Sequence, residues 1–276
     1  MREGRAALVT SFGCFKYMAL YSFIQFISVL ILYTFQTNLS DLEFLYIDLI
    51  ITTTIAVLLG YTGAYEKLVR KKPPDSLVKL SNIMSILVQV LVTAAFQLGV
   101  LFYLRDQPFY QNEDEPLLET DTWESTVIFL SSSFMYIAVA ISFSKGPPFR
   151  KPIYTNVPFL IAIILLFLFS TMMLLLPQAP VEDFIGMKPL HSVSFAFRVT
   201  IFAMSTGFLI MSGLMEWLFV DSGLMKCLYR KLQRKTPSRY KVIQDQIAST
   251  DWPPTGTTSF ADVSNDVSIS MSSADH

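Results

Sequence analysis

Six stretches of about twenty apolar residues recur along this chain, and polar segments separate them. A helix needs roughly 20 apolar residues to cross a hydrocarbon core about 30 Å thick, so each stretch is long enough to span a membrane. Only 16% of the 276 residues are charged, against about 25% in an ordinary soluble domain. The sequence therefore predicts a polytopic membrane protein.

The predicted spans are helical, because backbone polar groups in lipid must pair within their own segment. The fold class that we expect is therefore all-α, with about six transmembrane helices. The six spans run from about Tyr17 to Phe35, Phe44 to Tyr61, Leu80 to Leu104, Ser125 to Phe143, Val157 to Leu176 and Phe195 to Val220.

The lysine and arginine residues lie almost entirely on one side of these spans. Eighteen of the 21 precede the first span, follow the last one or occupy the second and fourth connections. Arg105, Lys188 and Arg198 fall on the other side, together with the acidic stretch 106–124. Because cytosolic connections carry the excess of basic residues, we expect both termini in the cytosol.

Composition divides the chain into three parts. Residues 1–16 form a basic segment before the first span, residues 17–220 hold the six spans, and residues 221–276 begin basic and end rich in Ser, Thr and Asp. Such a polar end buries too little apolar surface to offset its chain entropy. We therefore expect a disordered cytosolic tail.

Patterns for bond-breaking chemistry are missing from the sequence. The glycines are scattered, the two cysteines lie far apart, and the histidines are His191 and the terminal His276. Neither a phosphate-binding glycine loop nor a metal-ligand spacing is present. We expect no cofactor, no metal and no nucleic-acid partner for this chain, and it should not hydrolyse ATP alone.

One ionisable residue stands deep in an apolar span. Asp48 follows Asp41 by seven residues, which places it roughly 10 Å further along a helix. A carboxylate at membrane depth costs about 2.5 to 3.5 kcal/mol on insertion scales, and such residues are functional by default. The alternative is a structural aspartate that is protonated or paired with a neighbouring helix.

Polar side chains share one stripe of the first span. Tyr17, Tyr21, Gln25 and Ser28 fall at i, i+4, i+8 and i+11, which is the spacing of one helix face. The functional interpretation is a surface of phenols, an amide and a hydroxyl that lines a binding pocket. Ordinary hydrogen bonding between helices is the other interpretation, at about 0.6 kcal/mol per contact.

The second span carries a matching stripe, in which Asp41, Asp48 and Thr52 fall at i, i+7 and i+11. If the two stripes meet, they enclose a pocket with a carboxylate, aromatic faces and neutral acceptors. Carboxylate pairing and cation–π contact both favour an ammonium group over an anion. The sequence therefore predicts a site for an organic cation.

Several segments resemble the P5B-type ATPases over roughly residues 1–255. Most of them are similar to the fifth and sixth membrane helices of that family, and two look like the loop before its ninth helix and its tail. These segments are 2–12, 15–22, 25–33, 47–54, 144–156 and 251–254. The closest likeness is to a lysosomal polyamine-transporting member.

The resemblance implies that this chain is the C-terminal membrane part, helices five to ten, of an ATP-driven pump. Such a pump moves spermine or spermidine from the late endosomal or lysosomal lumen to the cytosol. Residues 1–16 would then be the end of the phosphorylation domain. The Asp-Lys-Thr-Gly motif, the nucleotide and actuator domains and the first four membrane helices of the family have no counterpart in this sequence.

The resemblance also implies site residues and partners. Tyr21, Gln25 and Asp48 match polyamine-contacting positions of the family, with Asp48 pairing an ammonium group. Secondary candidates are the other polar residues of the two stripes, namely Tyr17, Ser28, Asp41 and Thr52. The expected partners are membrane lipid, the polyamine and the remaining domains of the parent ATPase, which would bind ATP and Mg²⁺.

Two other functions stay open at this point. The chain could be a noncatalytic six-helix membrane protein, made as a short isoform, that associates with or regulates a full-length pump. A six-span cation channel is a further alternative, although no connection between the spans has the pattern of a selectivity filter.

Overall fold

The computed structural model describes residues 2–66, 80–110, 121–144 and 146–218. These residues all fall within one compact unit, Met1–Cys227. The predicted tail, residues 221–276, lies outside the described residues, so its disorder and its cytosolic location stay predictions. The division of the chain at residues 16 and 220 likewise stays a prediction.

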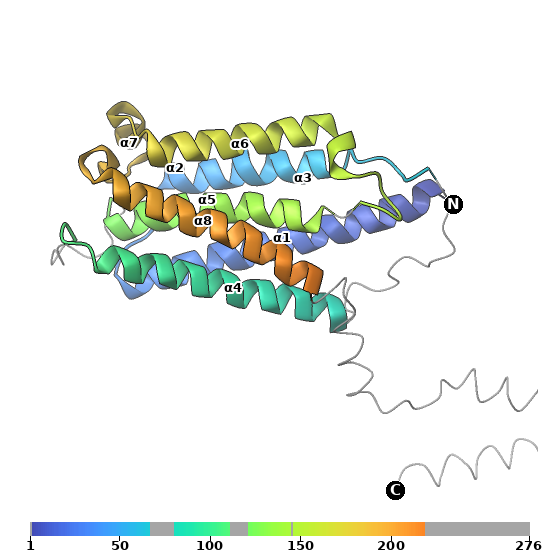
Figure 1. Cartoon of the computed structure of the whole chain (residues 1–276), viewed down its shortest axis with the longest axis horizontal. Helices are drawn as coiled ribbons and strands as arrows, with labels where there is room; N and C mark the ends of the chain where they lie inside the picture. Colours follow the sequence, from blue (N-terminus) through green and yellow to red (C-terminus); the bar gives the residue numbers. More distant parts are fainter. Residues whose placement is uncertain (1, 67–79, 111–120, 145, 219–276) are drawn as a thin grey trace, which may run out of the picture. The chain divides into compact units, whose positions relative to one another are not determined.

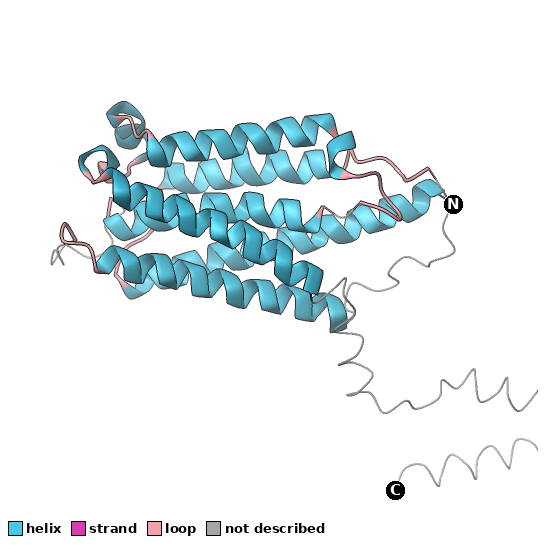
Figure 2. Ribbon diagram, viewed as in Figure 1, coloured by secondary structure: helices cyan, strands magenta, loops and turns pink. Residues whose placement is uncertain are grey.

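The described chain is a bundle of helices that run back and forth (Figures 1 and 2). Within the described ranges no strand forms, and Ala64 and Arg150 share an isolated β-bridge. The predicted all-α class and the six apolar spans are confirmed. In chain order the elements are α1 (Arg2–Thr34), α2 (Asp41–Leu45), η1 (Tyr46–Thr52), α3 (Thr53–Leu59), α4 (Leu80–Arg105), α5 (Trp123–Phe143), η2 (Ile153–Thr155), α6 (Val157–Leu175), α7 (Ala179–Ile185), η3 (Leu190–Ser192) and α8 (Phe195–Glu216).

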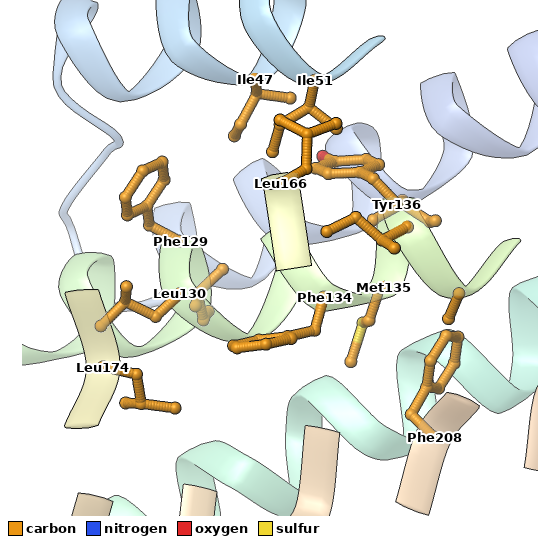
Figure 3. Packing of buried hydrophobic residues seen from close by; sticks show 14 of the residues in the cluster. Ile47, Ile51, Phe129, Leu130, Phe134, Met135, Tyr136, Leu166, Leu174 and Phe208 are labelled. Atoms are coloured by element: carbon orange, nitrogen blue, oxygen red, sulfur yellow. The ribbon is translucent and has the colours of Figure 1, made fainter. Parts of the chain in front are cut away.

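Helix α5 forms the centre of the bundle. It packs against α1, α4, α6, α8 and η1, and all its residues from Ser125 to Ala140 are buried. A helix that is apolar all round belongs in a core, and its serines Ser131, Ser132 and Ser133 donate their hydroxyl hydrogens to carbonyls of the preceding turn. Figure 3 shows the large side chains of α5 meeting those of η1, α6 and α8.

Helix α1 is longer than the predicted span. It begins at Arg2 and continues for 33 residues to Thr34, whereas the apolar run begins near Tyr17. The first turns carry Arg2, Glu3 and Arg5 and are largely exposed. The apolar span is therefore extended by a polar helical segment, and both belong to one continuous helix.

The second span is not one uniform α-helix. Residues Tyr46–Thr52 form a π-helical segment between α2 and α3, so that the backbone N–H of Thr53 reaches the carbonyl of Asp48, five residues earlier. The Thr53 hydroxyl donates to the same carbonyl at 2.8 Å. Single π-helical turns inside α-helices are frequent at functional sites, and this one contains Asp48.

The loop between α5 and α6 is fastened to the end of α3. Arg150, which is 1% exposed, donates from Nη2 to the carbonyl oxygen of Leu59 at 2.7 Å. Asn156 donates from Nδ2 to the Leu58 carbonyl at 2.8 Å and to the Thr62 hydroxyl at 3.0 Å. The loop therefore satisfies carbonyls that the last turn of a helix leaves without partners.

Candidate functional site

The site is built around a hydrogen bond between α1 and the π-helical segment. The phenol of Tyr21 donates to Oδ1 of Asp48, 27 residues later in the chain. Ile47 and Ile51, on either side of Asp48, are fully buried against α5 (Figure 3), whereas Asp48 itself is exposed. Because the two isoleucines fix the buried face of η1, the carboxylate points away from the interior, to the exposed surface of the bundle. We call this surface around Tyr21 and Asp48 the open face.

A group of buried hydroxyls lies beside this bond. Tyr17 is fully buried and Thr52 is 4% exposed, and their two hydroxyls interact across the α1–η1 contact. Neither hydroxyl makes a hydrogen bond of good geometry. The structure therefore brings four predicted residues together, with Tyr21 and Asp48 at the open face and Tyr17 and Thr52 behind them.

Tyr136 of α5 belongs to the same cluster, and the sequence analysis missed it. Its ring lies 5.6 Å from the ring of Tyr21 at an interplanar angle of 51°, and its hydroxyl is buried without a hydrogen bond. The available signal was a tyrosine in the middle of an apolar span, three residues after Ser133. Tyr136 supports the Tyr21 ring from within the bundle.

Gln25 adjoins the cluster on α1, whereas Asp41 lies seven residues before Asp48, or about 10 Å away at helical rise. Gln25 follows Tyr21 by one turn of α1 and is half-buried, and Asp41 is exposed in the first turn of α2. In the described part of the chain neither side chain has a hydrogen-bond or salt-bridge partner. The Gln25 amide is therefore available to a ligand at the Tyr21–Asp48 pair.

Ser28 does not join the cluster. Its hydroxyl donates to the Ile24 carbonyl at 2.9 Å and accepts a hydrogen bond from Nε2 of Gln97 on α4 at 2.7 Å. The side chain is 1% exposed, so it lies in the interface between α1 and α4. The predicted pocket stripe of α1 therefore ends at Gln25 in this structure.

The geometry is suited to binding a cation. The cluster has one carboxylate, a phenol that fixes its orientation, a free amide and the faces of tyrosine rings. Ion pairing with a carboxylate and contact with an aromatic face both stabilise an ammonium group. Among the described residues no group of three or more His, Cys, Asp and Glu is placed to hold a metal ion.

Comparison with known proteins places the chain among transport ATPases. The family model described as "Cation transporting ATPase, C-terminus" matches residues 36–218. The chain is 41% identical to Polyamine-transporting ATPase 13A2 of Homo sapiens over an alignment of 271 residues, which covers 92% of this chain and 22% of that protein. The Mus musculus protein of the same name is also 41% identical, over an alignment of 260 residues that again covers 92% of this chain and 22% of that protein.

A more distant relative is similar over a shorter stretch. Vacuolar cation-transporting ATPase YPK9 of Saccharomyces cerevisiae is 38% identical over 206 residues, 73% of this chain and 14% of that protein. The chain thus spans less than a quarter of the length of these relatives.

Proposed function

As the chain belongs to the family of cation-transporting ATPases and resembles the C-terminal membrane part of its P5B-type members, we propose that it supplies six membrane helices of an ATP-driven polyamine transporter. In this proposal the longer protein binds ATP and Mg²⁺ outside these helices and is phosphorylated there. Residues 1–16, which include the polar start of α1 from Arg2 onward, form the end of the phosphorylation domain and connect it to the membrane.

The observation that carries the proposal is the Tyr21–Asp48 pair at the open face of α1 and η1. A divalent metal ion in a protein is held by several oxygen ligands, whereas the described cluster offers a single carboxylate beside tyrosine rings. An alkyl ammonium needs one counter-charge and apolar or aromatic walls. Asp48 pairs one ammonium of the polyamine, and Tyr21 and Gln25 orient it.

The position of the site along the bundle supports uptake from the luminal side. The positive-inside rule places in the cytosol the end where α1 begins and α3 ends. Asp48 lies seven residues from the start of α2 and eleven from the end of α3, or about 10 Å and roughly 16 Å at helical rise. The proposed route runs from the late endosomal or lysosomal lumen, past Asp48, to the cytosol.

The relatives' names support the choice of substrate class. Two of them, from Homo sapiens and Mus musculus, are named as polyamine-transporting. We expect spermine and spermidine to stimulate ATP hydrolysis by the purified full-length protein in lipid, and K⁺ and Ca²⁺ to leave it at its basal rate. Equal stimulation by metal ions would exclude the proposed substrate class.

Replacing Tyr21 by phenylalanine should weaken the site without removing its charge. The change deletes the hydrogen bond that fixes the Asp48 carboxylate, and one such bond contributes on the order of 1 kcal/mol. We expect the spermine concentration for half-maximal ATPase stimulation to rise by about 3- to 10-fold. Tyr33→Phe is the matched control, since Tyr33 lies on the same helix and is 55% exposed; an equal effect of both changes would contradict the assigned role.

A further inference from the structure

A second polar region lies inside the bundle, on α4 and the helices that pack against it. Four side chains at four-residue intervals line one face of α4, namely Ser85, Gln89, Thr93 and Gln97. All four are at most 2% exposed. Hydrogen bonds join this region to Ser28 of α1, Ser142 of α5 and Ser212 and Glu216 of α8. Ser205 precedes Ser212 by seven residues and so lies on the same face of α8. We call this region the polar seam.

Hydrogen bonds fix the orientation of both amides in the polar seam. Gln89 donates from Nε2 to the backbone carbonyl of Ser212 at 2.9 Å, and a carbonyl can only accept. Gln97 donates from Nε2 to the hydroxyl of Ser28 at 2.7 Å, whose own hydrogen goes to the Ile24 carbonyl. Flipping the Gln89 amide would place two acceptors against each other, and flipping the Gln97 amide would cost the hydrogen bond from Ser28 to the Ile24 carbonyl, so Oε1 of each glutamine points elsewhere.

Several oxygens of the polar seam are left without a partner. Oε1 of Gln89, Oε1 of Gln97, Oγ1 of Thr93 and Oγ of Ser205 are buried and make no hydrogen bond. A buried polar group without a hydrogen bond costs roughly 1 to 3 kcal/mol. Four such oxygens on two helices in contact therefore indicate a ligand that donates hydrogen bonds.

The spacing of these oxygens decides the kind of ligand. Gln89 and Gln97 lie eight residues apart on α4, or about 12 Å at helical rise, so their oxygens cannot coordinate one cation. Successive side chains are about 6 Å apart along the helix, close to two hydrogen bonds of about 2.8 Å placed end to end. One water molecule in each gap can donate to the oxygen on either side.

We propose that the polar seam binds a file of ordered water molecules, which connects Gln89, Thr93, Gln97 and Ser205 through the middle of the bundle. The file begins near a buried charged group, because Oε2 of Glu216 accepts a hydrogen bond from Ser85 at 2.6 Å and Oε1 lies 3.7 Å from Nζ of Lys16. Water there extends a hydrogen-bonded path from this ion pair toward Ser28. The polar seam meets α1 at Ser28, seven residues or about two turns beyond Tyr21 of the Tyr21–Asp48 pair.

An electron-density or cryo-microscopy map of the full-length protein, at a resolution that shows ordered water, tests the proposal directly. We expect peaks within hydrogen-bond distance of Thr93 Oγ1 and of Oε1 of both glutamines. A map with these atoms packed against carbon alone would overturn the proposal. The test does not depend on the substrate, so it can fail while the polyamine proposal stands.

Thr93→Val supplies a second test, since it removes the hydroxyl and keeps the shape. If a water molecule binds Thr93, removing the hydroxyl takes one hydrogen-bond partner from that water. The midpoint of thermal unfolding should then fall by at least about 2 °C. If the seam is dry, the change removes an unpaired hydroxyl, and an unchanged or higher midpoint would overturn the proposal. Thr206→Val on α8 is the control, because its hydroxyl already donates to the Phe202 carbonyl at 2.9 Å.

Discussion

Replacing Asp48 by asparagine in the full-length protein is expected to lower the apparent affinity for spermine by about 10- to 100-fold. A charge-assisted hydrogen bond is roughly twice as strong as a neutral one, or about 1.5 to 3 kcal/mol, and each 1.4 kcal/mol corresponds to about tenfold in affinity. Asparagine keeps the shape and can still accept the hydrogen bond of Tyr21. The amide, however, cannot balance an ammonium charge away from water. Spermine-stimulated ATP hydrolysis across a spermine titration measures the effect.

The control for this change is Asp183→Asn, which removes an exposed carboxylate on α7. It should leave both the affinity and the maximal rate unchanged. Unchanged stimulation by Asp48→Asn would remove Asp48 from the substrate path and with it the main support for the polyamine proposal. Basal ATP hydrolysis without spermine reports whether the variant is folded.

The Tyr21–Asp48 pair could be predicted from the sequence because ionisable side chains are rare in membrane-spanning helices. A carboxylate in an apolar span is costly, so the position of Asp48 was conspicuous in a run of Ile, Leu and Thr. The periodicity of α1 then placed Tyr21 on a polar stripe. The structure shows that these two side chains meet, which neither stripe could establish alone.

The partners of the other polar residues could not be predicted in the same way. A period of 3.6 residues places Ser28 on the stripe of Tyr21, but its bond to Gln97 depends on how α1 packs against α4. The π-helical segment around Asp48 has more residues per turn than an α-helix. Side-chain positions expected for a uniform α-helix are therefore wrong in this segment. Tyr136 enters the site from α5, and only tertiary packing brings that helix beside α1.

Arg150 is another residue whose role required the structure. It stands in the segment 144–156, which the sequence analysis noted for its resemblance to a family loop. In the structure it is buried, and burial lowers the pKa of its guanidinium group. The cost of burying this charge is offset by the Leu59 carbonyl, at the end of α3 where the helix dipole is negative. Arg150 therefore fastens the loop after α5 to the end of α3, which continues directly from the π-helical segment that carries Asp48.

Replacing Arg150 by alanine should destabilise the bundle by about 2 to 4 kcal/mol. The change leaves the Leu59 carbonyl without a partner, at a cost of roughly 1 to 3 kcal/mol, and removes a side chain that fills a fully buried position. Arg150→Lys keeps a donor and should recover part of the loss. The midpoint of thermal unfolding of the purified full-length protein, followed by size-exclusion chromatography after heating, measures both effects.

The neighbouring Lys151 provides the control for this prediction. Its ammonium lies 3.7 Å from a carboxylate oxygen of Glu66, and both side chains are exposed. An exposed ion pair contributes about 0 to 1 kcal/mol, so Lys151→Ala should shift the midpoint little. If Arg150→Ala shifts it no more than Lys151→Ala, the guanidinium does not hold α3 to the loop. The position of Asp48 would then depend on the packing of Ile47 and Ile51 and on its hydrogen bond with Tyr21.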